Sequence, residues 1–113
     1  MTSRVVHISF SFPGVPKMLD LEPAIASICD DWIRYSTTNW FIFTSRDNVR
    51  IAEHLTKFLD PNDLVFVHDV NSDPAAGVWM ARLPPWVWNW LTVKMPGKLL
   101  WQQPTGLLPA PKT

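Results

Sequence analysis

Three features are missing from this 113-residue sequence: an excess of charge of one sign, a second cysteine and a long apolar run. Ten basic residues balance ten acidic ones, and a neutral chain has no long-range attraction for phosphate backbones, which disfavours avid non-specific nucleic-acid binding. Cys29 is the single cysteine, so an internal disulfide is excluded and a reducing compartment fits best. No run reaches the roughly 20 apolar residues of a membrane span, and the first residues lack the apolar core of a signal peptide. We therefore expect a soluble, cytoplasmic protein.

Tryptophan and proline, by contrast, are abundant. The chain has seven Trp, four of them between residues 79 and 90, and eleven Pro. Hydrophobic residues make up 47% and charged residues 18%, which is typical of a globular chain with room for one core. Prolines recur from Pro96 onward. We predict one domain over residues 1–95, including a Trp-rich extension, and a Pro-rich extended or disordered tail over residues 96–113.

Alternating and β-branched segments predict the strands. Residues 4–12 alternate between apolar and polar side chains, which is typical of a strand with one buried face. Residues 37–44 and 64–70 are rich in β-branched and aromatic side chains and predict two more strands. A further short strand is expected at residues 75–81. A short additional strand around residues 32–36 is also conceivable, as the alternative to a preceding helix that reaches Tyr35.

Helical spacing predicts helices between these strands. Pro23 suits a first helical turn, and an apolar stripe continues this helix toward Tyr35 through Ile25, Ile28, Cys29 and Trp32. Ser45 is expected to cap a second helix, with Asp47 in its first turn and an apolar stripe of Ile51, Ala52, Leu55, Phe58 and Leu59. Pro84 and Pro85 predict the start of a last helical turn that carries residues 86–91.

With the short strand included, the order is β-α-β-β-α-β, which predicts the α+β class and a ferredoxin-like sandwich. In that fold an antiparallel sheet carries two helices on one face. The opposite face then presents polar residues of the first strand and, from the last strand, either Val65 and Val67 or Phe66 and His68. A half-apolar open face on a small protein usually needs a partner, so we expect a homodimer.

Several segments resemble a known family. They are residues 5–11 with Pro13-Gly14, residues 32–37 leading into 39–44, residues 60–70, Ala76-Gly77 and residues 88–91. These segments are similar to the small CRISPR-associated adaptation protein that dimerises as partner of the integrase, and more closely to its SinR-like and VapD-type relatives. The resemblance implies a ferredoxin-like dimer whose sheets pack face to face, with the strand after the fourth exchanged between subunits.

The resemblance also implies a metal-binding Asp at the end of the first strand for phosphodiester cleavage. The nearest position here is Ser11, and residues 1–19 contain no acid. A hydroxyl cannot replace a carboxylate as ligand of a hard cation, because it brings no charge. The sequence therefore disfavours a nuclease, and we expect neither a cofactor nor catalytic residues.

Two histidines form the sharpest candidate pair. If the first and last strands are antiparallel neighbours, their midpoints place His7 opposite His68, with Asp69 close by, and two such pairs could meet at a dimer axis. Two ligands without a third make a poor zinc site, so we favour hydrogen-bonded histidines in a dimer interface with Ser9 and Ser11. A carboxylate metal site is conceivable from the acids at 30, 31, 60, 63 and 69, but turn and helix-end chemistry explains them better. Cys29 fits a small buried hydrophobe.

The tryptophans complete the functional prediction. Aromatic rings dominate protein interfaces and also stack on bases, but few basic residues accompany these, so nucleic acid is the less favoured partner. On a helix, Trp86 and Trp90 should be packed and Trp88 exposed. We expect a non-catalytic dimeric module that binds a partner protein through Trp79, Trp86, Trp88 and Trp90. A metal-dependent endonuclease or ribonuclease toxin of the same superfamily is the alternative.

Overall fold

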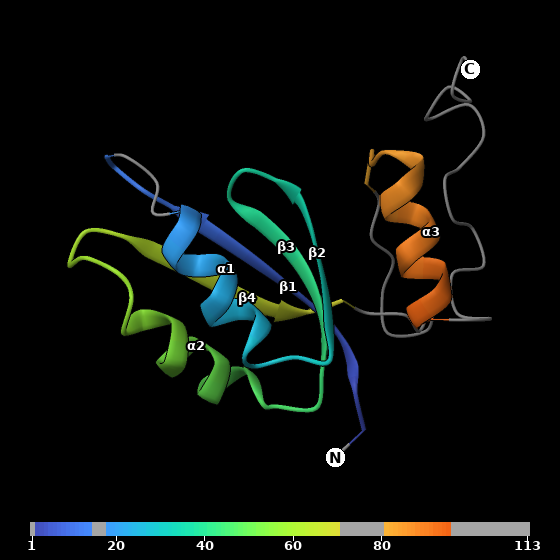
Figure 1. Cartoon of the computed structure of the whole chain (residues 1–113), viewed down its shortest axis with the longest axis horizontal. Coiled ribbons are helices and arrows are strands. Elements are labelled where there is room, and N and C mark those ends of the chain that lie inside the picture. The colour runs from blue at the N-terminus through green and yellow to red at the C-terminus, as the bar shows by residue number, and fades with distance from the viewer. Residues whose placement is uncertain (1, 15–17, 71–80, 96–113) are drawn as a thin grey trace. The chain divides into compact units, whose positions relative to one another are not determined.

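The computed structural model describes residues 2–14, 18–70 and 81–95 of the chain. In chain order its elements are β1 (Arg4–Ser11), α1 (Met18–Ala26), β2 (Asp31–Ser36), β3 (Asn39–Thr44), α2 (Asn48–Thr56), β4 (Leu64–Asp69) and α3 (Pro85–Lys94) (Figure 1). The chain divides into two compact units, Met1–Val70 and Asn71–Thr113. No helix within the described ranges has the length and apolar character that crossing a membrane requires.

The first unit is built on a four-stranded sheet with the strand order β2-β3-β1-β4. Every neighbouring pair is antiparallel, and the first strand, β1, lies between β3 and β4. The short strand predicted at residues 32–36 is confirmed as β2, which forms a hairpin with β3. The α+β class is therefore confirmed, with the element order β-α-β-β-α-β up to Val70.

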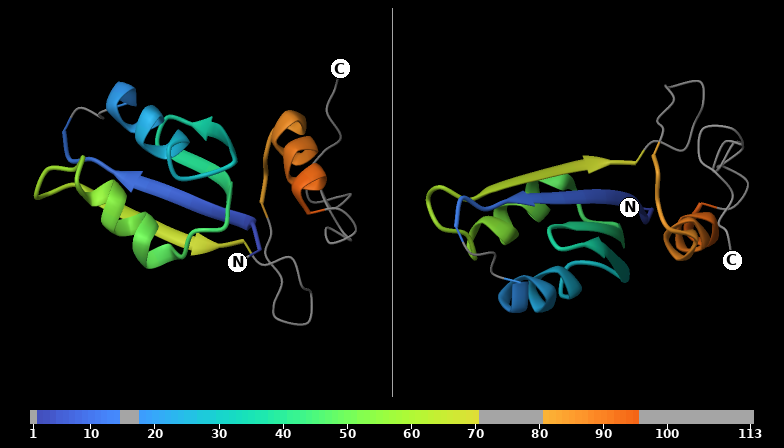
Figure 2. Two further views of the ribbon diagram at one scale, coloured as in Figure 1. Left: turned by 60° about the horizontal axis from the view of Figure 1, so that its bottom comes forward. Right: turned by 90° about the horizontal axis from the view of Figure 1, so that it is seen from above.

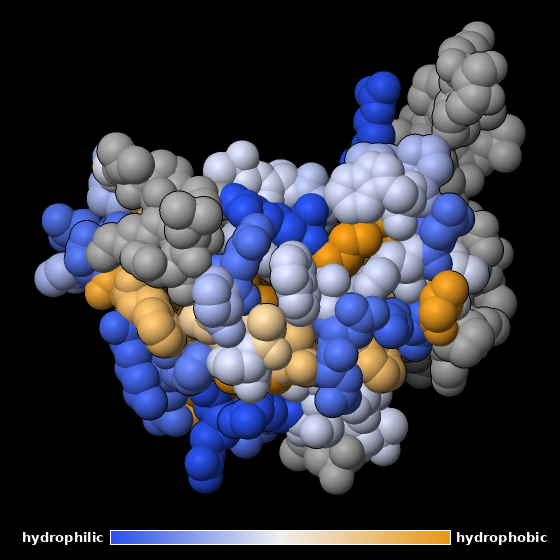
Figure 3. Space-filling view, viewed as in Figure 1, coloured by the Kyte–Doolittle hydropathy of each residue, from blue (hydrophilic) through white to orange (hydrophobic). Residues whose placement is uncertain are grey.

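Helices α1 and α2 lie on the same face of this sheet, the helix face (Figure 2). Alternate strand residues point toward the helices and form one core with them, as the period of two requires. Its fully or nearly fully buried members are Val6, Ile8, Phe10, Leu21, Ala24, Ile25, Ile28, Trp40, Ile42, Ile51 and Leu55. In the view of Figure 1, hydrophobic residues appear as separate patches among hydrophilic ones (Figure 3).

The first helix ends much earlier than its apolar spacing predicts. Helix α1 stops at Ala26, and Pro23 lies inside it and not at its start. Ser27 closes the last turn, because its hydroxyl donates to the Ala24 carbonyl at 2.8 Å. The backbone N–H of Asp30 then donates to the Phe43 carbonyl at 2.8 Å and brings the chain into the sheet. The prediction of a helix that continues through Trp32 toward Tyr35 is therefore wrong, because sheet pairing takes over this segment.

The second helix begins two residues later than expected. Asp47, not Ser45, is the N-cap residue: its carboxylate accepts the backbone N–H of Arg50 at 2.8 Å. The backbone before it is held differently, since the Thr44 hydroxyl accepts the N–H of Arg46 at 3.1 Å. The negative carboxylate also interacts favourably with the positive end of the helix dipole, which an uncharged serine hydroxyl does not.

In the second unit, the predicted helix after Pro84 is confirmed as α3, but the prediction of its exposed face is wrong. Trp88 is only 5% exposed, whereas Trp86 is 50% exposed, and Trp90 is half-buried. The buried side of the helix is defined by an aliphatic stripe with a four-residue period: Val87, Leu91 and Met95. Trp88 is next to this stripe and is therefore buried with it. The expected strand at residues 75–81 and the tail from Pro96 lie outside the described residues.

Candidate functional site

The sheet face opposite α1 and α2, the second face, carries a cluster of aromatic and imidazole side chains. Each of the four strands contributes to it, and we call it the histidine cluster: Tyr35 from β2, Phe41 from β3, His7 from β1, and Phe66 and His68 from β4. The strand registers place His7 directly opposite both Phe41 and His68. The predicted pairing of His7 with His68 is thus confirmed.

The two imidazoles are in direct contact. His7 Nδ1 lies 3.1 Å from His68 Nε2, and the ring centroids are 5.0 Å apart. On its other side, His7 Nε2 lies 2.5 Å from the Tyr35 hydroxyl. Phe41 flanks His7 at 5.0 Å and stacks on Tyr35 at 4.9 Å between ring centroids. His7 is thus held by a partner at each ring nitrogen and by an aromatic ring.

With both imidazoles neutral, one set of proton positions satisfies all of these contacts. His68 Nδ1 lies 3.3 Å from the Asp69 carbonyl oxygen, which can only accept, so this nitrogen carries the proton. His68 Nε2 then accepts from His7 Nδ1–H, and His7 Nε2 accepts from the Tyr35 hydroxyl. In this arrangement Tyr35 is the first donor in the chain.

Burial favours this neutral state. The desolvation of His7, and then the nearby charge that His68 carries when protonated, lower the pKa of His7 to about 4. Burial also raises the pKa of Tyr35. The His7 imidazole and the Tyr35 hydroxyl are therefore both uncharged at neutral pH.

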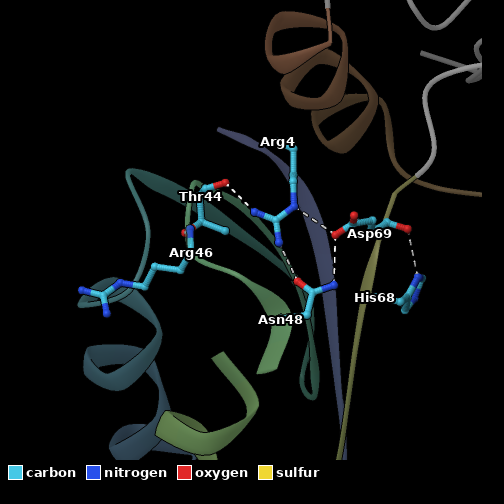
Figure 4. A network of polar contacts seen from close by, with 6 residues as sticks. All are labelled: Arg4, Thr44, Arg46, Asn48, His68 and Asp69. Atoms are coloured by element: carbon cyan, nitrogen blue, oxygen red, sulfur yellow. Dashed lines mark hydrogen bonds and ion pairs between the residues drawn. The ribbon is translucent and has the colours of Figure 1, made fainter. Parts of the chain in front are cut away.

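A polar network on the helix side of the sheet holds the backbone that orients His68 (Figure 4). Arg4 Nε donates to the Asp69 carboxylate at 3.0 Å, and the Asn48 side-chain amide donates to the same oxygen at 3.0 Å. The Arg4 guanidinium also donates to the Asn48 side-chain oxygen at 2.7 Å and to the Thr44 carbonyl at 3.1 Å. This Arg4 network joins β1, β3, the start of α2 and the end of β4.

Exposure on the second face differs from strand to strand. Val5 and Phe41 are buried, but Leu64 and Phe66 on the edge strand β4 are each 64% exposed. The predicted interface residues His7, Ser9, Ser11 and His68 all share this face, with Ser9 opposite Phe66 and Ser11 opposite Leu64. Of the two arrangements left open for the last strand, the structure shows the one that presents Phe66 and His68.

The acidic residues and Cys29 do not join the histidine cluster. Asp63 accepts the backbone N–H of Asp60 at 2.8 Å within a turn, and Asp30 accepts the Ser3 hydroxyl at 3.0 Å. Over residues 2–14, 18–70 and 81–95, no three His, Cys, Asp or Glu side chains are grouped so that they could hold a metal ion. Burial and the nearby charges of Asp31 and Asp30 raise the pKa of the Cys29 thiol to about 11. That thiol is protonated and weakly nucleophilic at neutral pH.

The tryptophans predicted to bind a partner are not equivalent. Trp88 is buried in α3, and Trp90 stacks with Lys94, whose Nζ lies 5.6 Å from the ring centroid. Trp86 keeps half of its surface exposed, and Trp79 lies outside the described residues. Within this helix, Trp86 is thus the ring most accessible to a partner.

Sequence reasoning missed Tyr35, Phe41 and Arg4. The signal for Tyr35 was weak, because the residue was expected at the end of a helix and not on an edge strand. Once the strand at residues 32–36 is placed next to β3, Tyr35 and Phe41 fall on the same face as His7. Arg4 could be found only from the register that brings Asp69 beside Val6.

Comparison of the chain with protein-family models, curated proteins and solved structures gives no match. The resemblance to the CRISPR-associated adaptation proteins therefore stays a prediction from sequence. A functional proposal for this chain depends on the geometry of its own residues.

Proposed function

We propose that this protein is a non-catalytic interaction module, which forms a homodimer through the second face of its sheet. The observation that carries the proposal is the exposed pair Leu64 and Phe66, each 64% exposed beside the His7–His68 contact. The proposal includes a ferredoxin-like sandwich for residues 2–70, which the order β4-β1-β3-β2 supports. The face-to-face dimer is also the assembly that the family resemblance implies.

A second copy is the occupant that fits this surface best. Leu64, Phe66 and His68 alternate along the edge strand β4 and make a strip in which apolar and imidazole side chains follow one another. In a two-fold dimer the same strip of both copies is in contact, so the apolar side chains of one copy can pack against those of the other. Because the chain has no net charge, two copies do not repel each other electrostatically at long range.

The chemistry of the second face supports binding more than catalysis. Ser11 lies at the end of β1 opposite Leu64, so the position that corresponds to the family's carboxylate holds a hydroxyl beside an apolar side chain. Within the described residues no observation favours the nuclease alternative. The two histidines of the cluster are hydrogen-bonded to one another, as in an interface, and burial lowers the pKa of His7.

The proposal places partner-protein binding on α3, around Trp86. Trp86 is 50% exposed and Val93, two turns later on the same side, is 71% exposed. Exposed aromatic and aliphatic side chains of this kind supply the central contacts of protein interfaces. This surface replaces the one expected around Trp88.

The dimer is tested by sedimentation equilibrium and light scattering on the full chain at micromolar concentration. Wild-type protein should have twice the 13.0 kDa chain mass, and Phe66→Asp should have the mass of one chain. Val49→Asp is the matched control, because Val49 is 68% exposed but lies on α2. A wild-type mass of one chain, or an equal effect of the two substitutions, would refute the proposal.

The partner surface is tested by affinity capture from the native host with three variants. Trp86→Ala and Val93→Ala should fold normally and lose the captured protein, whereas Glu53→Ala, exposed on α2, should retain it. A partner whose capture survives both Trp86→Ala and Val93→Ala does not bind here.

A further inference from the structure

We propose that His7 and His68 form one half of a transition-metal site, which a second copy of the chain completes with its own His7 and His68. The inference rests on the homodimer proposed above and adds a ligand to it. The ligand class is a divalent ion that prefers imidazole and accepts tetrahedral geometry, with Zn²⁺ as the reference ion.

The spacing of the two ring nitrogens suits a shared ion. With metal–nitrogen bonds of about 2.0–2.1 Å, two ligands of one tetrahedral ion have nitrogens roughly 3.3 Å apart. His7 Nδ1 and His68 Nε2 are 3.1 Å apart, so their separation matches that of two ligands of one ion to within a few tenths of an ångström. To bind the ion, each ring must also turn so that its lone pair points at the ion and not at the other nitrogen. The two side chains come from the middle of adjacent antiparallel strands, and that pairing fixes their separation.

The surrounding hydrogen bonds allow both nitrogens to present lone pairs. His68 Nδ1 is engaged with the Asp69 carbonyl, so its Nε2 is already free of a proton. His7 Nδ1 must give up its proton to bind a metal, and the ring can do so by changing tautomer. The proton then resides on His7 Nε2 and is donated to the Tyr35 oxygen, which lies 2.5 Å away and can accept as well as donate. The number of protons on the three side chains is unchanged.

Both histidines thus have the outer partners typical of metal ligands. A metal-binding histidine almost always donates its second N–H to a carbonyl, a carboxylate or another fixed acceptor, which sets the ring orientation. Tyr35 takes this role for His7, and the Asp69 carbonyl takes it for His68. Arg4 and Asn48 hold Asp69 through its carboxylate, so the residue that orients His68 is itself fixed (Figure 4).

One copy of the chain cannot complete the site from its described residues, since none of them adds a third ligand to the pair. A two-fold axis that passes beside His68 supplies the missing two nitrogens and gives four imidazoles around one ion. His68 is exposed and therefore accessible to a second copy, and the exposed Leu64 and Phe66 of both copies would exclude water around the metal. The proposed stoichiometry is one ion per two chains.

The experiment uses full-length protein freed of any affinity tag and of metal, titrated with Zn²⁺ against a chromophoric chelator. Wild-type protein should bind one Zn²⁺ per two chains, and Zn²⁺ should lower the dimer dissociation constant at least tenfold. Co²⁺ should give the intense visible absorption of a tetrahedral site. His68→Gln should weaken Zn²⁺ binding at least a hundredfold. His54→Gln, which changes the third histidine of the chain on α2, should bind like wild type.

The outcomes separate the two proposals. A dimer that takes up no Zn²⁺ at this stoichiometry, or whose Zn²⁺ binding survives His68→Gln, would overturn the metal site and leave the dimer intact. One ion bound per chain by a monomer would also overturn it. A protein that stays monomeric with and without Zn²⁺ would overturn the dimer and the metal site together.

Discussion

The two faces of the sheet differ although they are built from alternate residues of the same strands. On β1, Val6, Ile8 and Phe10 are buried in the core with α1 and α2, while His7 and Ser9 point the other way. The helix face is apolar, closed and supported by two helices. The second face combines hydrogen-bonded imidazoles with exposed apolar residues on the edge strand. The contrast indicates that one face stabilises the fold, whereas the other leaves large apolar side chains exposed.

The largest expected difference is in the free energy of unfolding. Trp40 is fully buried on the helix face, so Trp40→Ala should lower this free energy by about 3–5 kcal/mol. Phe66→Ala on the second face should lower it by under ~1 kcal/mol in dilute solution, and by more as protein concentration rises. Urea unfolding followed by circular dichroism at two concentrations measures both. Equal losses at low concentration would remove the distinction between the faces.

A second expectation concerns the reactivity of Cys29, which packs against the helix-face core. Its pKa is raised from 9.0 to about 11, so at pH 8 the thiolate fraction in the folded protein should be roughly a hundredfold below that of the unfolded chain. Alkylation by iodoacetamide should be slower by a similar factor, and its rate should keep rising with pH above 9. Rates in buffer and in urea provide the comparison. A folded-state rate that levels off near pH 9 would show that the helix face does not shield this thiol.

The smallest expected effect concerns the start of α2, which covers part of the helix face. Asp47→Ala removes the cap on the Arg50 N–H and should cost about 1 kcal/mol of stability. Ser45→Ala, two residues earlier, should change the unfolding midpoint very little. The pair of variants in one urea series tests the assignment, and a larger loss from Ser45→Ala would return the cap to Ser45.

Much of the first unit could be predicted from local sequence, and the reasons are physical. The alternation in β1 and the β-branched composition of β3 and β4 identify strands because a half-buried or buried strand requires those side chains. The His7–His68 register also followed, since antiparallel strands of similar length pair near their midpoints. The residues of the helix-face core could be predicted from the period of two in the strands and the helical spacing in the helices.

What could not be predicted depends on competition between distant segments. The residues after Ala26 have helical apolar spacing, yet Trp32 lies in β2. The backbone of this segment forms hydrogen bonds with β3, and this tertiary pairing outweighs the local helical preference. On α3 the buried side was predicted from the tryptophans, but it follows the regular spacing of Val87, Leu91 and Met95. Tyr35 entered the candidate site only through the strand order, which local sequence does not encode.

The central position of β1 has a consequence for how the chain acquires its structure. The first strand pairs with β3 and β4 and has no partner nearby in sequence, and its Arg4 side chain reaches an acceptor 65 residues away. The β2–β3 hairpin can form early because its loop is short, whereas the β1–β4 ladder must close the longest loop in the unit. During synthesis, one edge of β1 therefore remains unpaired until β4 (Leu64–Asp69) has been made. The His7–His68 contact lies in that ladder, so the candidate site forms only once β1 and β4 have paired.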